Sequence, residues 1–397
     1  MKTSVIIPTY QHCDDLLKPC IESIIKYTDL SDIEIVIVAN GCTDGTREYV
    51  KSLGDPFKLV WFDEGLGFTK ATNEGVKAST GENIILMNND VVLLDQPKNQ
   101  WREFLETPLK DNIGITANLK IWDYSVERMF AVFFLCAFPR HIWDKVGPLD
   151  ESWSPGGGED IEFCILVEQL GYKIIQVPDE HNDVINGINV NRFMSYHAGE
   201  ATMMDAEHKE KWEIHIADVR KRLEYKYKLP QGWFYGEDIN EYRQLIEDVP
   251  EGGTIGELGC AWGRSICSVA DIIKRKNLKV IIVDCFTGTP SEGLPVADYQ
   301  GVFEDNLKRF GIEAEIHKGF TNDVAKDIPD GTFNELFIDC DHQYESVKQD
   351  LENWVPKIKT HGTISGHDYN NGFGVSKAVN ERWSNIRLWG SVWSKRL

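Results

Sequence analysis

The chain has 397 residues, enough for two or three domains, and its 42% hydrophobic and 26% charged residues exclude wholesale disorder. With 42 basic against 63 acidic residues, the formal net charge is -21, which argues against nucleic acid and anionic membrane as partners. A phosphate-bearing ligand would therefore need local help from a metal ion or from backbone N–H groups.

The first half of the chain alternates short apolar segments with helical patterns. A helix is predicted over 14–27 and another from about Thr46. The predicted strands are 4–8, 33–39, 58–62 and 83–87. This alternation is typical of a mostly parallel α/β sheet, which binds ligands at the carboxyl ends of its strands. The polar or small residues expected there are Pro8, Thr9, Tyr10, Asn40, Asp44, Gly67, Asn73, Asn89 and Asp90.

The second half repeats the alternating pattern. Helices are predicted over 239–249 and 346–358, so a second doubly wound α/β sheet is expected. The predicted strands are 254–258, 279–284, 333–339 and 363–365. A charged helical stretch and a Pro-Gln-Gly break at 230–232 separate the two halves. The expected domains are therefore 1–228 and 229–397.

Five motifs occur in order in the first domain. They are Val5-Ile-Ile-Pro-Thr-Tyr10, Asn40-Gly-Cys-Thr-Asp-Gly-Thr46, Gly67-Phe-Thr-Lys-Ala-Thr-Asn73, Met87-Asn-Asn-Asp-Val91 and Gly158-Glu-Asp-Ile-Glu162. Over roughly 3–200 the chain resembles family 2 glycosyltransferases with the GT-A fold. The resemblance implies a UDP-, GDP- or dTDP-linked sugar donor, held by the residues at the strand ends, and a glycan acceptor. The family usually has Asp where Ala39 stands, so base or ribose recognition is expected to rest on Asn40 and Asp44.

The same resemblance implies a metal and a base. A diphosphate leaving group is stabilised by Mn²⁺ or Mg²⁺, for which Asp90 and His197 are the implied ligands. Asp160, after Glu159 at the donor site, is the implied general base of an inverting reaction. The plain alternatives are an ordinary loop histidine and acidic residues that favour a helix N-terminus.

Glu257-Leu-Gly-Cys-Ala-Trp-Gly-Arg-Ser265 joins a predicted strand to a helix in the second domain. Glycines allow a ligand to approach the backbone closely, and a helix N-terminus favours negative charge. Ala261 departs from the G-x-G-x-x-G pattern of dinucleotide-binding proteins. Asp284, at the end of the next strand, suits ribose hydroxyls in either case.

Three further motifs lie downstream. They are Val283-Asp-Cys-Phe-Thr-Gly-Thr-Pro290, Phe337-Ile-Asp-Cys-Asp-His-Gln-Tyr344 and Gly362-Thr-Ile-Ser-Gly-His-Asp-Tyr369. Over about 236–385 the chain resembles class I S-adenosylmethionine-dependent methyltransferases, closest to the metal-assisted O-methyltransferases of sugars and catechols. The resemblance implies His342 as the base. The implied cofactor contacts are Glu257, Gly259, Gly263, Ser265 and Asp284, and the implied metal ligands are Asp339, His367 and Asp368.

The sequence also bears on the compartment. The apolar run 129–138 is too short to span a bilayer, and the first ten residues lack the apolar core of a signal peptide. The sequence has nine cysteines, an odd number, and contains no C-x-x-C motif. We therefore expect a cytoplasmic protein with reduced thiols and no membrane span.

The leading hypothesis is a bifunctional enzyme that transfers a sugar and O-methylates a glycan hydroxyl. A second hypothesis makes only one domain catalytic and the other a binding or assembly module, because Ala39 and His367 depart from the usual family residues. A third makes the second domain a dinucleotide-dependent reductase. Aspartate-to-asparagine changes at Asp160 and Asp339 should each abolish one activity under the first hypothesis.

Overall fold

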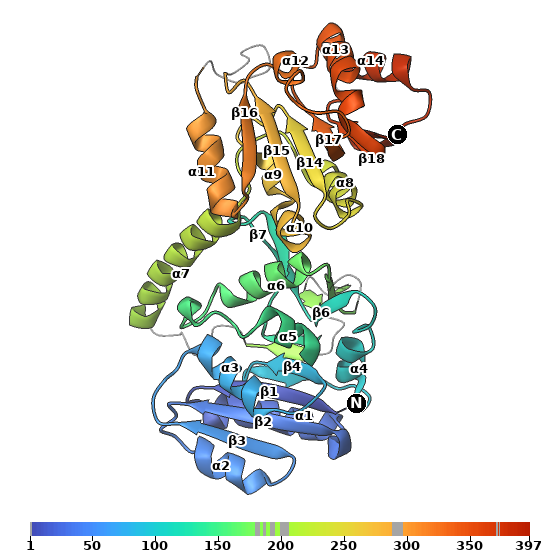
Figure 1. Ribbon diagram of the computed structural model, residues 1–397. Coiled ribbons are helices and arrows are strands. Elements are labelled where there is room, and N and C mark those ends of the chain that lie inside the picture. Colours follow the sequence, from blue (N-terminus) through green and yellow to red (C-terminus); the bar gives the residue numbers. More distant parts are fainter. Residues whose placement is uncertain are drawn as a thin grey trace. The chain divides into compact units, whose positions relative to one another are not determined.

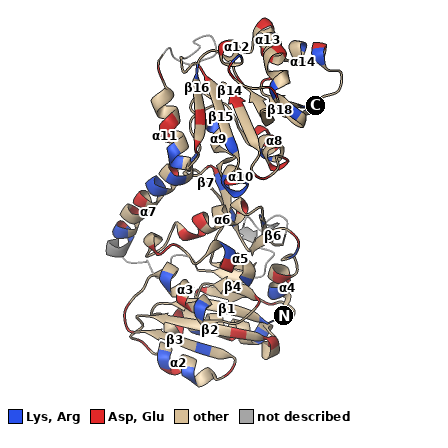
Figure 2. Ribbon diagram, viewed as in Figure 1, with Lys and Arg blue, Asp and Glu red and all other residues tan. Residues whose placement is uncertain are grey.

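The computed structural model describes residues 2–178, 183–185, 188–190, 195–198, 206–287, 297–370, 372 and 374–397. The chain divides into two compact units, Met1–Tyr225 and Lys226–Leu397, three residues before the boundary expected from the sequence. Helix α7 (Ala206–Tyr227) runs through the division and carries both acidic and basic side chains (Figure 1; Figure 2). Both units are α/β, as the sequence predicts.

The N-terminal unit is built on a seven-stranded sheet of order β10-β6-β9-β4-β1-β2-β3. Its strands are β1 (Thr3–Thr9), β2 (Ile33–Asn40), β3 (Phe57–Phe62), β4 (Asn83–Met87), β6 (Ile113–Ala117), β9 (Leu135–Pro139) and β10 (Lys173–Gln176). The pairs are parallel except where β9 runs antiparallel to both neighbours. All five residues of β9 are buried, which accounts for part of the apolar run 129–138.

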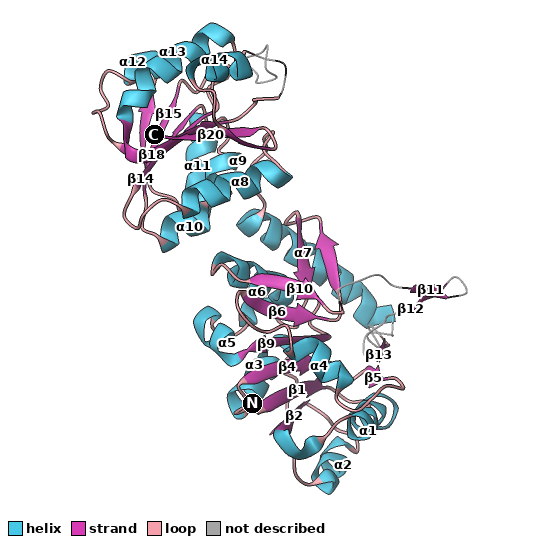
Figure 3. Cartoon of the chain, turned by 90° about the vertical axis from the view of Figure 1, so that its right-hand side faces the viewer, coloured by secondary structure: helices cyan, strands magenta, loops and turns pink. Residues whose placement is uncertain are grey.

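Helices cover both faces of this sheet (Figure 3). They are α1 (Lys18–Tyr27), α2 (Thr46–Leu53), α3 (Phe68–Ala78), α4 (Gln100–Glu106), α5 (Arg140–Val146) and α6 (Glu159–Gln169). Val5 and Ile7 of β1 face a core that includes Ile21 of α1. Ile6 points to the opposite face, where a Cβ on Gly75 of α3 would lie 2.3 Å from it. This alternation is the two-residue period of a strand buried on both sides.

Three two-stranded sheets complete the described part of the N-terminal unit. They are β5 (Val91–Leu93) with β13 (Ser195–His197), β7 (Lys120–Asp123) with β8 (Arg128–Ala131), and β11 (Asp183–Ile185) with β12 (Ile188–Val190). The first of these matters for function, because β5 directly follows Asp90 and β13 ends at His197.

The C-terminal unit has a seven-stranded sheet of order β16-β15-β14-β17-β18-β20-β19. Its strands are β14 (Thr254–Leu258), β15 (Lys279–Asp284), β16 (Ala314–Lys318), β17 (Phe333–Ile338), β18 (Ile358–Gly366), β19 (Arg387–Trp389) and β20 (Val392–Arg396). The first five strands in this order are parallel, and β20 is antiparallel to both neighbours. Separate apolar clusters lie on the two faces of the sheet.

The helices of this unit are α8 (Gly236–Glu247), α9 (Arg264–Cys267), α10 (Ala270–Arg275), α11 (Gln300–Phe310), α12 (Thr321–Val324), α13 (Tyr344–Trp354) and α14 (Val375–Arg382). The helix predicted over 346–358 ends at Trp354, and a tighter turn containing Pro356 follows. A proline cannot donate the next helical hydrogen bond. Strand β18 therefore begins at Ile358, five residues before the predicted start.

In each sheet the strand order reverses between two neighbouring parallel strands. The reversal lies between β1 and β4 in the N-terminal unit and between β14 and β17 in the C-terminal unit. Ligands of open α/β sheets bind in the crevice outside the carboxyl ends of such strands. Within the described part of the chain, every helix is too short or too polar to cross a bilayer.

Candidate active sites

The predicted donor site of the N-terminal unit lies where β1 and β4 end side by side. Thr9 ends β1, and Asn89 follows β4. Nδ2 of Asn89 donates a hydrogen bond of 2.9 Å to Oγ1 of Thr9, and both side chains are buried. Pro8 is buried within β1, whereas the Tyr10 side chain is 49% exposed. Of the three residues predicted at the first strand end, Tyr10 therefore offers a ligand the most open surface.

Asn40 and Asp44 organise the loops after β2. Oδ1 of Asn40 accepts a hydrogen bond from the N–H of Leu66, and Nδ2 donates to the carbonyl of Gly67 at 3.4 Å. Asp44 accepts a bond of 2.6 Å from the Thr46 hydroxyl and one of 2.8 Å from a backbone N–H. Burial raises the pKa of Asp44, but these hydrogen bonds outweigh burial and hold the pKa below its ordinary value. Both side chains therefore already bind the protein itself.

Gly67 and Asn73 fasten α3 to the segment 149–155. Asn73 donates from Nδ2 to the carbonyl of Leu149 at 2.9 Å and accepts at Oδ1 from its N–H at 3.0 Å. A Cβ at Gly67 would lie 2.5 Å from Oγ of Ser154, and the residue has a φ of +78°, so only glycine fits. The structure thus shows Asn73 holding helix α3 to the Leu149 backbone, and its predicted contact with the donor remains a prediction.

Asp90 and His197 meet although 107 positions separate them in the sequence. Antiparallel pairing of β5 with β13 brings them together, and the N–H of Ala198 donates to the carbonyl of Asp90 at 3.2 Å. Nε2 of His197 lies 3.3 Å from Oδ1 of Asp90. The imidazole stacks on Phe134, with ring centroids 4.1 Å apart and planes 8° from parallel, which fixes its direction.

This pair suits a divalent cation. Oδ1 of Asp90 and Nε2 of His197 are both buried, and apart from their mutual approach neither has a hydrogen-bond partner among the residues that the structure describes. Such atoms are costly to leave unpaired in a folded protein. A carboxylate oxygen and an imidazole nitrogen are both ligands that Mn²⁺ accepts, and two ligands leave coordination positions for the oxygens of a diphosphate.

Glu159 and Asp160 begin α6. Glu159 is buried, and its Oε2 accepts a bond of 3.0 Å from the N–H of Gly158. Burial, and then the negative charge of Glu159, raise the pKa of the partly exposed Asp160 well above its ordinary value. A carboxylate with a raised pKa is a stronger proton acceptor once it is ionised. Among the described residues, no hydrogen bond or ion pair joins Asp160 to Asp90 or His197.

Helix α7 packs on the glycine run before Asp160. Nε2 of His215 lies 2.8 Å from the carbonyl oxygen of Gly156. A Cβ on Gly157 would come 2.5 Å from Cδ1 of Ile216, so the helix and the loop are in close contact. The glycines therefore serve close packing as well as turning the chain.

The C-terminal unit holds a cavity of about 450 Å³ at the carboxyl ends of its central strands. It is lined by residues that follow β14, β15, β17 and β18, as a doubly wound sheet leads one to expect. The predicted site residues on its wall are Gly259, Ser265, Asp284, Asp339, His342, His367 and Asp368. The structure therefore brings nearly the whole predicted set into one cavity.

Glu257 lies beneath the cavity and not on its wall. Its side chain has no exposed surface, accepts a bond of 2.5 Å from the Ser265 hydroxyl, and is contacted by the Tyr242 hydroxyl at 3.4 Å. Burial raises the pKa of Glu257 to about 8. A Cβ at Gly259 would lie 2.4 Å from the carbonyl oxygen of Asp339, which explains the glycine. Gly263 has a φ of +86° and turns the loop into α9.

Asp284 is held firmly at the end of β15. Its Oδ2 accepts hydrogen bonds from the N–H of Cys260 at 2.8 Å and of Ala261 at 3.3 Å. Its Oδ1 accepts from the N–H of Phe286 at 2.6 Å and from the Tyr299 hydroxyl at 3.1 Å. The carboxylate thereby ties the glycine loop to the next strand end while still lining the cavity.

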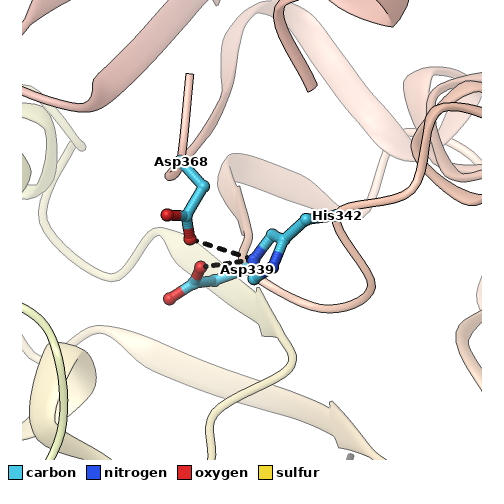
Figure 4. Close-up of side chains that lie close together, drawn as sticks. All are labelled: Asp339, His342 and Asp368. Atoms are coloured by element: carbon cyan, nitrogen blue, oxygen red, sulfur yellow. Dashed lines mark hydrogen bonds and ion pairs between the residues drawn. The ribbon is translucent and has the colours of Figure 1, made fainter. Parts of the chain in front are cut away.

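Asp339, His342 and Asp368 form a compact cluster at the ends of β17 and β18 (Figure 4). Nε2 of His342 lies 3.0 Å from Oδ2 of Asp368 and 3.4 Å from Oδ1 of Asp339. One ligand atom from each of the three lies within 4.8 Å of the others. Two carboxylates and one imidazole are a donor set that fits a divalent cation.

His367 joins this cluster from the side. Its Nδ1 lies 3.1 Å from Oδ2 of Asp368 and 3.7 Å from Oδ1 of Asp339. Its Nε2 lies 3.3 Å from Oδ2 of Asp238 in α8. The three predicted metal ligands and the predicted base are therefore adjacent, with one further carboxylate behind them.

The protonation of His342 constrains its predicted role as a base. Burial alone lowers its pKa, but the hydrogen bonds and charges of Asp339 and Asp368 raise the pKa to about 10. With those carboxylates free, His342 is an imidazolium at neutral pH and has no site to accept a proton. A role as a base requires a cation to replace the proton between the two carboxylates.

Comparison with known proteins gives each unit a family. The model of glycosyl transferase family 2 matches residues 4–117, and a methyltransferase domain model matches residues 257–369. The chain therefore combines a family 2 glycosyltransferase domain with a methyltransferase domain. The second match favours methyl transfer over the dinucleotide-dependent reductase, and the predicted fold class is confirmed for both domains.

The similar proteins cover parts of the chain. Glycosyltransferase AglE of Haloferax volcanii is 31% identical over 104 residues, which is 25% of this chain and 33% of AglE. An uncharacterised glycosyltransferase of Nostoc sp. is 35% identical over 127 residues, which is 31% of this chain and 38% of that protein. The O-methyltransferase NovP has a TM-score of 0.36 and 18% identity, over 40% of this chain and 78% of NovP. The chain thus spans well under half the length of these curated relatives.

Sequence reasoning missed several residues of the methyltransferase domain. Asp238 lies in the first turn of α8, where an acidic residue is expected for helix stability alone. Asp341 lines the cavity and accepts a bond of 2.6 Å from the Ser346 hydroxyl. The segment 231–234 also lines the cavity, although its Pro-Gln-Gly sequence indicated only a break between domains.

Proposed function

We propose that the chain is a bifunctional glycan-modifying enzyme that transfers a sugar from a nucleotide-sugar donor and O-methylates a sugar hydroxyl. The observation that carries the proposal is that each family match contributes to its own cluster of chemically competent side chains. Asp90 of the first match meets His197, which lies beyond that match, and Asp339, His342 and Asp368 meet within the second. The donor is a UDP-, GDP- or dTDP-linked sugar, and the methyl donor is S-adenosylmethionine.

In the sugar-transfer step an acceptor hydroxyl attacks the anomeric carbon from the side opposite the diphosphate. The bond from that carbon to the diphosphate oxygen breaks, a nucleoside diphosphate leaves, and the configuration inverts. Asp160 accepts the hydroxyl proton, and its raised pKa suits that task. Asp90 and His197 would hold a Mn²⁺ or Mg²⁺ ion, which supplies positive charge to the leaving diphosphate.

In the methyl-transfer step a sugar oxygen attacks the methyl carbon of the sulfonium. The carbon–sulfur bond breaks, S-adenosylhomocysteine leaves, and His342 takes up the hydroxyl proton. Gly259, Ser265 and Asp284 line the part of the cavity assigned to the cofactor. Asp339, Asp368 and His367 would hold a divalent cation, which lowers the pKa of the sugar hydroxyl.

Two linked assays test the proposal. The chain is first screened with Mn²⁺ against UDP-, GDP- and dTDP-sugars for release of the nucleoside diphosphate. The purified transfer product is then incubated with methyl-labelled S-adenosylmethionine, and incorporation of label into the glycan is measured. We expect both signals. Diphosphate release without label transfer would leave one catalytic domain beside a binding or assembly module.

A further inference from the structure

The segment that joins α7 to α8 lies on the wall of the methyltransferase cavity. Gln231, Gly232, Trp233 and Phe234 all line the 450 Å³ cavity. This segment lies outside the methyltransferase match, which begins at residue 257. All the contacts described below lie within the C-terminal unit.

Arg264 fastens the segment to the cofactor loop. Its Nε–H donates to the carbonyl of Phe234 at 2.7 Å, and an Nη1–H donates to the carbonyl of Pro230 at 2.9 Å. The guanidinium carbon lies 4.3 Å from the centre of the Tyr235 ring. Arg264 is buried and directly follows Gly263, so it holds the segment against the loop that ends β14. The planar fork of arginine is suited to contact two carbonyls at once.

Two aromatic residues of the segment reach both ends of the cavity. The Phe234 ring is buried and meets the His367 ring edge to face, with centroids 5.2 Å apart. The Trp233 ring lies 5.9 Å from the Trp262 ring in the cofactor loop. The segment therefore contacts the acidic and histidine cluster with one side chain and the cofactor loop with the next.

Trp233 presents a large, partly exposed ring to the cavity. Its side chain is 56% exposed although it lines a cavity and sits beside another indole. Trp389 in β19 is 54% exposed and is not among the residues lining the cavity, so it provides a matched comparison.

We propose that residues 230–235 form one wall of the methyltransferase site and help to retain the bound cofactor. Trp233 contacts the cofactor, and Arg264 is the positioning residue that holds the wall in place. This inference rests on the proposed function of the C-terminal domain as an S-adenosylmethionine-dependent enzyme. The segment between the two domains is then part of an active site and not a spacer.

Calorimetric titration of the full chain with S-adenosylhomocysteine tests the inference. Trp233→Ala should weaken binding about tenfold, whereas Trp389→Ala should leave it unchanged. Arg264→Lys should weaken binding about fivefold, because one ammonium cannot replace the two-carbonyl fork. In methyl-transfer assays both Trp233→Ala and Arg264→Lys should raise KM for S-adenosylmethionine and leave kcat within about twofold.

The outcomes separate the two levels of the proposal. If the unaltered chain does not bind S-adenosylhomocysteine, the proposed function of this domain is wrong. If it binds and both variants bind within twofold of it, the wall inference is overturned. Should Arg264→Lys fail to fold, Gly232→Ala is the second variant, because its Cβ would lie 3.0 Å from Cβ of Arg264 and displace the wall. Unchanged binding by that variant and by Trp233→Ala would equally overturn the inference.

Discussion

The two domains differ in how many candidate metal ligands they bring together. In the glycosyltransferase domain, one carboxylate and one imidazole, Asp90 and His197, meet at 3.3 Å. In the methyltransferase domain, Asp339, His342 and Asp368 offer ligand atoms within 4.8 Å of one another, with His367 beside them. A cation at the first pair would need further ligands, which a donor diphosphate would supply, whereas Asp339, Asp368 and His367 of the second site would supply three ligands from the protein itself.

The two sites also differ in how their predicted bases are prepared. Burial and a neighbouring carboxylate raise the pKa of Asp160, which strengthens it as a proton acceptor. Two neighbouring carboxylates raise the pKa of His342 to about 10, which fills its acceptor site with a proton. The two predicted bases therefore differ in what holds their protons: burial favours the neutral carboxyl of Asp160, and two carboxylates favour the imidazolium of His342.

The largest expected effect is on sugar transfer when the predicted base is removed. Asp160→Asn keeps the size of the side chain and removes the proton acceptor, so sugar transfer should fall about a thousandfold. Methyl transfer to a ready-made glycan should be unchanged, because the chemistry belongs to the other domain. Nucleoside diphosphate release and label incorporation, measured on the same preparation, check this outcome.

Asp144→Asn is the matched control for this change. Asp144 is an exposed aspartate of α5 in the same domain. The control should retain full sugar transfer. Sugar transfer by Asp160→Asn at the rate of the control would remove Asp160 from the mechanism.

The next prediction tests whether the two domains differ in how they bind Mn²⁺. Asp339→Asn should lower the Mn²⁺ affinity of the donor-free chain and the rate of methyl transfer about a hundredfold, because it removes one ligand of the cluster. Asp90→Asn should leave donor-free Mn²⁺ binding unchanged and abolish only the additional Mn²⁺ bound when UDP or GDP is present. Mn²⁺ titrations followed by electron paramagnetic resonance measure both. The reverse pattern would contradict the comparison.

Part of each site follows from the sequence for a physical reason. Strands read as apolar runs, and the polar residues just after them must gather at one edge of a parallel sheet. Asp339 and His342 are three positions apart, and Asp368 lies two residues past the end of the neighbouring strand, so their meeting is a consequence of the fold. The prediction that Asp90 and His197 are metal ligands follows only from the family resemblance, because a small two-stranded sheet joins them.

Long-range side-chain contacts could not be read from the sequence in the same way. Asn73 clamps Leu149, which is 76 positions away, and nothing in the local pattern near Asn73 indicates that partner. Arg264 donates a hydrogen bond to the carbonyl of Phe234, 30 positions earlier in the sequence. This bond holds the segment between the predicted domains against the cavity. Such contacts depend on how loops pack, and loops lack the hydrophobic periodicity from which strands and helices are predicted.

A smaller effect separates clamping from donor binding at Asn73. Asn73→Ala leaves two buried backbone groups of Leu149 unpaired, which should cost about 2–3 kcal/mol of stability in the N-terminal domain. KM for the donor should change by less than twofold. Thermal unfolding and donor kinetics check the two parts, with the exposed Asn112→Ala as control. A large rise in KM without loss of stability would instead support the donor contact.

The final prediction concerns the pH dependence of stability and the buried carboxyl beneath the methyltransferase cavity. Burial raises the pKa of Glu257 from an ordinary 4.5 to about 8. Between these pH values the folded domain holds a proton that the unfolded chain has lost, so the free energy of unfolding falls as pH rises through this window. Below 4.5 the contribution is fully present, and above about 8 no further loss occurs.

Glu257→Gln tests this by keeping the shape of the side chain and an acceptor for the Ser265 hydroxyl while removing the titration. The Tm of the C-terminal domain should then depend less on pH between 4.5 and 8, with about 2–4 °C for each kcal/mol removed. Scanning calorimetry of the variant and of the exposed Glu352→Gln of α13, at matched pH values, measures the difference. Equal slopes in both would mean that Glu257 is ionised in the folded protein. A nearby donor would then have to stabilise its charge, and the Ser265 and Tyr242 hydroxyls are the groups in place to do so.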